Sequence, residues 1–200
     1  MSKKRMKPIV DLDRFRKLVT EMHESLKKGN WSPFDDRDKL CIATTLGWTV
    51  AHEQAKHGWT TEDKKILKLA TTLGWTVAHE QAKHGWTTED KKILKLATTD
   101  WGWTVAHEQA KRGWITNDKE ILKLTDNHGT TVYSLIIDYW NRKDLDKINK
   151  NFNELFSFIL ELEKLGLEFI KETQLYENVM YLARLRAEIL SKLLKRINSK

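Results

Sequence analysis

The chain has 200 residues, of which 40% are hydrophobic, and this length fits one compact domain or one short repeat array. Two Pro and nine Gly argue against a loop-rich or disordered chain, and no window approaches the roughly 20 consecutive apolar residues of a membrane-spanning helix. A single cysteine, Cys41, excludes an internal disulfide, and the basic start lacks the apolar stretch of a signal peptide, so a cytoplasmic protein is expected.

The net charge of +7 is concentrated at the two ends of the chain. Residues 1–20 carry seven Lys/Arg against two Asp, and residues 181–200 carry six Lys/Arg against one Glu, which gives +5 at each end. The rest of the chain has 22 Lys/Arg against 25 Asp/Glu, or −3. The basicity is therefore no property of the middle of the chain, and it favours nucleic-acid or anionic-membrane binding only through the termini.

The first predicted element is an amphipathic helix from Asp11 to Lys28, which Gly29 and Asn30 end. Its apolar side chains recur at helical spacing: Phe15, Leu18, Val19, Met22 and Leu26. We therefore expect residues 1–30 to form a basic segment and an N-terminal cap.

A repeat follows, because Leu46–Thr72 recurs residue for residue as Leu73–Thr99, with a period of 27. A diverged third copy begins at Gly102 after one inserted residue, a fourth start is at Gly129, and Asp36–Thr45 is the tail of a degenerate unit. In each unit a Thr such as Thr49 can cap a first helix, and Thr60 or Thr61 can cap a second. The pattern predicts short helical hairpins over residues 31–140 that must bury their apolar faces against one another.

Two longer helices are predicted in residues 141–200. They could close the array or pair with a second copy of the chain to form a homo-oligomer. Their apolar stripes comprise Leu145, Ile148, Phe152, Leu155, Phe156, Ile159 and Leu162, and then Val179, Leu182, Leu185, Ile189, Leu193 and Ile197.

The string from Gly47 to Gly58, GWTVAHEQAKHG, resembles the ankyrin repeat signature, and Gly74–Gly85 and Gly102–Gly113 match it equally. The resemblance implies an all-α, ankyrin-like solenoid in which Thr49, Thr76 and Thr104 cap helices and His52, His79 and His107 secure turns between repeats. Val50, Val77 and Val105 stand where the family favours Pro, and the family period is about 33. The missing residues are expected to come from the projecting β-turn finger and from the end of the second helix, and the sequence leaves open whether the finger forms any strand.

Each unit carries two tryptophans. Trp59, Trp86 and Trp114, between the two helices, are expected to pack under the loop. Trp48, Trp75 and Trp103, after the turn glycine, form either a binding strip or an inter-repeat packing layer. The hypothesis is a protein-binding scaffold that meets its partner through these three tryptophans and through neighbouring charges: Glu53, Lys56, Glu80, Lys83, Glu108 and Lys111.

Other chemistry finds little support in the sequence. His52 and His57 lie five residues apart, whereas two zinc ligands on one helix need a spacing of four, and the third copy has Arg112 in place of the second histidine. There is no phosphate loop or serine nucleophile elbow, and Cys41 has no evident activating partner. No catalytic residue, metal or cofactor is expected. An alternative function is binding of nucleic-acid phosphates by basic clusters at the two ends: Lys3, Lys4, Arg5 and Lys7, and Lys192, Lys195, Arg196 and Lys200. A further alternative is binding to an anionic membrane through the helix that contains Arg184 and Arg186.

Overall fold

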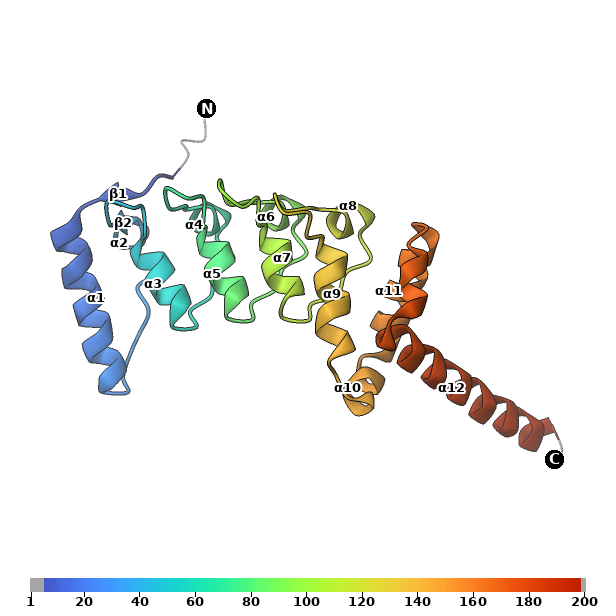
Figure 1. Ribbon diagram of the computed structural model, residues 1–200. Coiled ribbons are helices and arrows are strands. Elements are labelled where there is room, and N and C mark those ends of the chain that lie inside the picture. The colour runs from blue at the N-terminus through green and yellow to red at the C-terminus, as the bar shows by residue number, and fades with distance from the viewer. Residues whose placement is uncertain (1–5, 199–200) are drawn as a thin grey trace, which may run out of the picture.

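The computed structural model describes residues 6–198, and its secondary structure is mostly helical. Five helices stand side by side in one row (Figure 1): α1 (Leu12–Lys27), α3 (Val50–Lys56), α5 (Val77–Lys83), α7 (Val105–Ala110) and α9 (Val132–Asn141). The repeated sequence therefore builds a repeated helical arrangement. Along one edge of the row lie short helices and loops, with α2 (Arg37–Leu40), α4 (Lys64–Leu67), α6 (Lys91–Leu94) and α8 (Lys119–Leu122).

The first helix of each repeat is the longer of its two helices, and we call α3, α5 and α7 the long repeat helices. A reciprocal cap fixes the start of each of them. Thr49 accepts a hydrogen bond from the His52 backbone N–H, while His52 Nδ1 accepts one from the Thr49 N–H at 3.1 Å. The same pair forms at Thr76 with His79 and at Thr104 with His107. Such caps are worth about 0.5–2 kcal/mol each, a useful contribution for helices of seven residues or fewer. The predicted threonine caps are confirmed.

The second helix of each unit is short and begins later than predicted. It has four residues, and Asp63 caps it rather than Thr60 or Thr61. Thr61 instead accepts a hydrogen bond from the Asp63 N–H at 3.1 Å. Asp90 and Asp118 repeat the cap in the next two units.

Small and branched side chains alternate in the core of the array. Two alanines on each long repeat helix are fully buried, for example Ala51 and Ala55, which lets neighbouring helices approach closely. Ile and Leu of the following short helix, such as Ile93 and Leu94, are 1% exposed and cover the packed helices. Burying each such side chain contributes about 1.5–3 kcal/mol, so each unit is held mainly by its neighbours.

Strands are present, which corrects the all-α prediction. β1 (Ile9–Val10) pairs in parallel with β2 (Ile42–Ala43), with Ile9 opposite Ile42. In addition, every unit closes its turn with a one-residue antiparallel bridge, as between Ala70 and Thr76. The turn fingers are thus short, and they are also linked from unit to unit, because the Thr72 N–H donates to the Leu46 carbonyl and the Thr99 N–H to that of Leu73, each at 2.9 Å.

The C-terminal region is divided differently from the prediction. Its first predicted helix is two helices, α10 (Leu145–Lys150) and α11 (Phe152–Lys164), which a 3-10 helix (Glu168–Glu172) follows. The last, α12 (Gln174–Asn198), packs on α9, α10 and α11 and then projects away from them (Figure 1). Val179 and Leu182 are buried, but Leu185 and Ile189 are 40% and 50% exposed. The side chains of Leu193 and Ile197 lie outside the described residues, and oligomerisation through this region stays a prediction.

Candidate functional site

The three tryptophans that follow the turn glycines are half-buried and held in one orientation. Trp48 Nε1–H donates to Glu53 Oε2 at 2.9 Å, Trp75 to Glu80 at 2.9 Å and Trp103 to Glu108 at 3.0 Å. Each indole also lies against the histidine four residues later, with ring centroids 4.9–5.0 Å apart. The rings therefore contribute to packing and still reach the surface, and their role in binding a partner stays a prediction.

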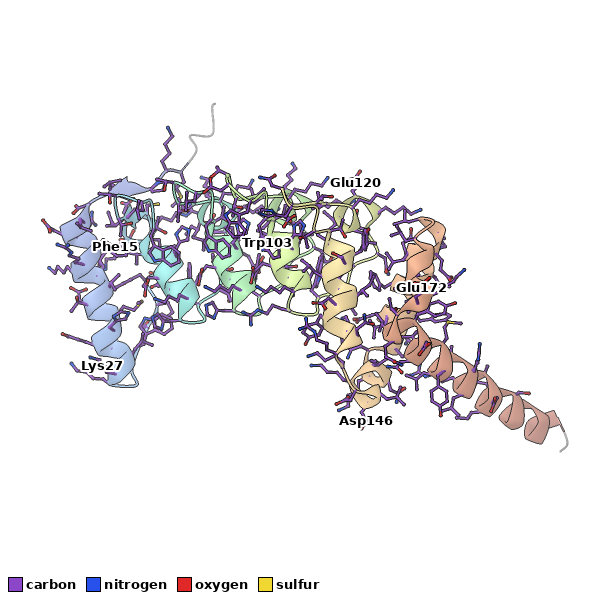
Figure 2. The ribbon with its side chains drawn as sticks, in the orientation of Figure 1. Phe15, Lys27, Trp103, Glu120, Asp146 and Glu172 are labelled. Carbon is purple, nitrogen blue, oxygen red and sulfur yellow. The ribbon has the colours of Figure 1, made fainter. Side chains whose placement is uncertain are left out.

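An open groove of about 1060 Å³ runs across these tryptophans. A second row of apolar side chains lines it from the tips of the turns: Leu46, Leu73 and Trp101, which are 68%, 58% and 62% exposed. Trp103, labelled in Figure 2, lies near the middle of the row of helices, close to the edge that carries the turns. Threonines from the turns complete the apolar lining, and the groove extends to His128, whose ring meets that of Trp101 edge-on at 5.5 Å.

The tip residues were missed by the sequence analysis. The available signal was a leucine directly before the turn glycine in two identical copies, replaced in the third by two residues, Asp100 and Trp101. A leucine beside a turn glycine is more exposed than one within a helix, because the turn projects from the body of the fold.

The charged residues predicted to meet a partner divide into two sets. Lys83, Glu108 and Lys111 line the groove, whereas Glu53, Lys56 and Glu80 do not. Glu53, Glu80 and Glu108 are only 7%, 1% and 5% exposed, and each carboxylate accepts a hydrogen bond from the indole N–H of its unit. We therefore correct their role from partner contact to support of the indoles. Burial acts to raise the pKa of Glu53, but hydrogen bonds from Trp48 and Lys56 outweigh it and hold that pKa below its usual value.

The second tryptophan set packs as predicted, half-buried against the core clusters. It also links repeats, since Trp86 Nε1–H donates to Glu62 at 2.9 Å and Trp114 Nε1–H to Glu89 at 3.1 Å.

The repeated histidines connect adjacent units. His52 Nε2 lies 3.1 Å from the Trp75 carbonyl, His79 Nε2 3.1 Å from that of Trp103, and His107 Nε2 3.1 Å from that of Thr130. Because Nδ1 accepts and Nε2 donates, each ring is neutral. Burial lowers the pKa of His52 and His79 to about 4 and also lowers that of His107.

A different group of side chains gathers at the first long repeat helix. The ligand atoms of three side chains lie within 4.8 Å of one another: His23 of α1, Glu53 of α3, and His57, the residue directly after α3. The sequence analysis compared His52 with His57 and missed this group. Glu53 and His57 are four residues apart, the spacing that brings two side chains together on a helix.

Cys41 belongs to the core cluster that Trp59 packs against and is 3% exposed. Burial, followed by the charge of Asp38, raises the pKa of its thiol to about 11. The thiol is therefore protonated near neutral pH and is a poor nucleophile.

Most of the basic residues predicted to bind phosphates stand at the two ends of the chain. Lys3, Lys4, Arg5 and Lys200 lie outside the described residues, as do the side chains of Lys192, Lys195 and Arg196. Arg186 packs over the Phe152 ring at 3.9 Å and donates to Asn149, so it joins α12 to the preceding helices. None of the helices in the described part of the chain has the length and apolar character needed to cross a membrane.

The geometry offers an apolar groove built from repeated aromatic and aliphatic side chains, with mixed charges at its rim. Such a surface can bind an apolar segment. Comparison with models of known protein families finds no match to this chain, and no curated protein matches its sequence.

Proposed function

We propose that this chain is a protein-interaction scaffold that binds an apolar segment of a partner protein in the groove over Trp48, Trp75 and Trp103. The observation that carries the proposal is the row of exposed apolar tips, Leu46, Leu73 and Trp101, beside that groove. Soluble proteins rarely expose contiguous apolar surface without a use for it, because its contact with water costs free energy.

The chemistry of the groove indicates which kinds of side chain a partner segment would place in it. The indole N–H groups already donate to glutamates, so the rings offer their apolar surface and not a hydrogen bond. The lining has two lysines, Lys83 and Lys111, and one exposed carboxylate, Asp100. Two further carboxylates in the lining, Glu108 and Asp126, are only 5% and 8% exposed and accept hydrogen bonds within the fold. This mixture gives no strong preference for an anion, and the partner segment that fits best is rich in aromatic or aliphatic side chains.

We further propose that the array is a shortened ankyrin-like solenoid. Three observations support this: the Thr–His caps, the histidine contacts to the next unit, and turn fingers reduced to single bridges. A solenoid would present equivalent side chains in a row on each successive unit.

The alternative of nucleic-acid binding rests on the terminal Lys/Arg clusters. It predicts an affinity that falls steeply with salt and is lost when residues 1–8 and 192–200 are removed. The groove gives that alternative little support, because only two lysines line it.

The test uses peptides selected from a displayed random library on the full-length chain. Serine at all three tips, in the variant Leu46→Ser, Leu73→Ser and Trp101→Ser, is expected to weaken the selected peptides about 100-fold, or ~2.7 kcal/mol. The midpoint of thermal unfolding is expected to change little, because all three side chains are mostly exposed.

A matched control is available on α12. Tyr181, Ile189 and Leu190 are 56%, 50% and 60% exposed, so serine at these three positions removes a similar apolar surface elsewhere. The control variant should bind the peptides as the wild type does. Equal binding by the tip variant, or an equal loss in the control, would refute the proposed groove.

A further inference from the structure

His23, Glu53 and His57 form a small cluster that joins the first helix of the chain to the first long repeat helix. His23 Nε2 and His57 Nε2 each lie 3.6 Å from Glu53 Oε1. The two imidazole rings meet edge-on with their centroids 5.3 Å apart. In the described part of the chain, no other three His, Cys, Asp or Glu side chains bring their ligand atoms this close together.

Direct hydrogen bonding does not explain the arrangement, because 3.6 Å is too long for such a bond. Two of the three spacings suit a shared metal ion as they stand, and the three ligand atoms all lie within 4.8 Å of one another, so a small rotation of the exposed histidines would bring the third spacing into range. A tetrahedral zinc ion with ligands at about 2.0–2.2 Å holds its ligand atoms roughly 3.4 Å apart. Imidazole nitrogen and carboxylate oxygen are also ligands that zinc accepts.

The carboxylate at the centre of the cluster is fixed in place. Glu53 Oε2 receives the Trp48 N–H at 2.9 Å, which leaves Oε1 directed at the two histidines. Support of this kind from a second layer of residues orients metal ligands in proteins. The histidine side chains are 45% and 32% exposed, so an ion can reach them from solvent.

The second copy of the repeat shows what α1 adds. Glu80 and His84 correspond to Glu53 and His57, and His84 Nε2 lies 3.3 Å from Glu80 Oε1. The helix that precedes α5 in the row is α3 and not α1. Among the described residues no third ligand therefore joins this pair. In the third copy Arg112 replaces the histidine. Only the first copy has three ligands.

We infer that His23, Glu53 and His57 bind a divalent transition-metal ion, zinc being the best match, and that the ion ties the N-terminal cap helix to the repeat array. One competitor is present, because Lys56 Nζ lies 3.2 Å from Glu53 Oε1. The lysine side chain is 52% exposed and can swing into solvent when the ion binds. Displacing it lowers the affinity, and we expect micromolar rather than nanomolar binding.

Calorimetric titration of the full-length chain with Zn²⁺ near neutral pH tests the site. The wild type should bind one equivalent, and His23→Ala and His57→Ala should each weaken binding about tenfold or more. His23→Asn keeps a polar side chain at this position and should show the same loss. Zinc should also raise the thermal unfolding midpoint of the wild type, and slow hydrogen exchange in α1, but do neither in the His23 variants.

His84→Ala is the matched control, since it removes the same residue from an identical sequence that has only two ligands, and His128→Ala removes another exposed histidine. Both should bind zinc as the wild type does. The inference is overturned if the wild type shows no micromolar binding, if the His23 variants bind equally well, or if His84→Ala abolishes binding.

Discussion

The first two copies of the repeat have identical sequences but different neighbours. On the side of the following unit their contacts agree, since His52 and His79 each lie 3.1 Å from a tryptophan carbonyl of the next repeat. On the other side they differ. Gln54 exchanges two hydrogen bonds with the Phe34 backbone, at 2.6 and 3.1 Å, while the buried Gln81 side chain has no hydrogen-bond partner among the described residues.

This comparison separates what a repeat sequence determines from what its neighbour determines. Helix caps and contacts to the next copy recur wherever the sequence recurs. Contacts to the preceding element depend on whether that element is the cap or another repeat. The zinc ligands belong to the second class, because His23 is supplied by α1.

The largest expected effect is a loss of stability in acid through the shared histidine contacts. The pKa of His52 and His79 is about 4 in the folded chain and about 6.5 when unfolded, so the unfolded state takes up protons first as the pH falls. The contribution of these histidines to the free energy of unfolding is complete above pH ~6.5 and falls between pH ~6.5 and ~4. At pH 5 the chain has lost about 2 kcal/mol of stability per histidine.

Urea unfolding at neutral pH and at about pH 5 measures this loss. His79→Gln should be less stable than the wild type at neutral pH, because glutamine cannot reproduce both hydrogen bonds, but its stability should vary less with pH. An unchanged pH dependence in this variant would contradict a neutral, buried His79.

A smaller effect is expected where the two copies differ. Gln54→Leu should destabilise the chain by about 1–3 kcal/mol, because it leaves the Phe34 N–H and carbonyl without their partner. Gln81→Leu should lie within ~1 kcal/mol of the wild type or stabilise it, since no hydrogen bond is lost. Denaturant midpoints of the two variants measure the difference, and equal losses would show that the copies have equivalent surroundings.

The smallest effect concerns the second tryptophan set. Trp86→Phe removes the exposed hydrogen bond to Glu62 and should cost up to ~1 kcal/mol more than Trp59→Phe. Trp59 Nε1 has no hydrogen-bond partner in the part of the chain that the structure describes, so Trp59→Phe is the control. Thermal unfolding of both variants decides the order, and a larger loss at Trp59 would contradict it.

The local features of the fold were predictable because they depend on neighbouring residues. Thr49 before an apolar helical stretch predicted its own cap, and the stripe of Phe15, Leu18 and Met22 predicted a buried face, which the structure confirms. The cap of the second helix was predicted wrongly, because the two candidates, Thr60 and Thr61, lie before Asp63, and only Asp63 stands directly before the helix with its side chain in reach of the free N–H groups.

The site was less predictable, because it depends on residues distant in sequence. The row of Trp48, Trp75 and Trp103 was predictable because the three residues occupy equivalent positions of the repeat. The exposure of Leu46 and Leu73 was not predictable, because it depends on how far the turns project. Burial of Glu53 and Glu80 depends on the indoles that cover them. His23 precedes Glu53 by 30 positions, so only the packing of α1 on α3 brings them together.

The measurement that tests the proposed groove most directly is the shift of indole N–H signals in nuclear magnetic resonance spectra when a selected peptide binds. The nine tryptophans give separate probes, which single Trp→Phe variants assign. We expect the signals of Trp75 and Trp103 to move. The signals of Trp59 and of Trp140, whose N–H donates to the Gly113 carbonyl, should stay in place. Shifts confined to Trp59 and Trp140 would contradict the proposed groove.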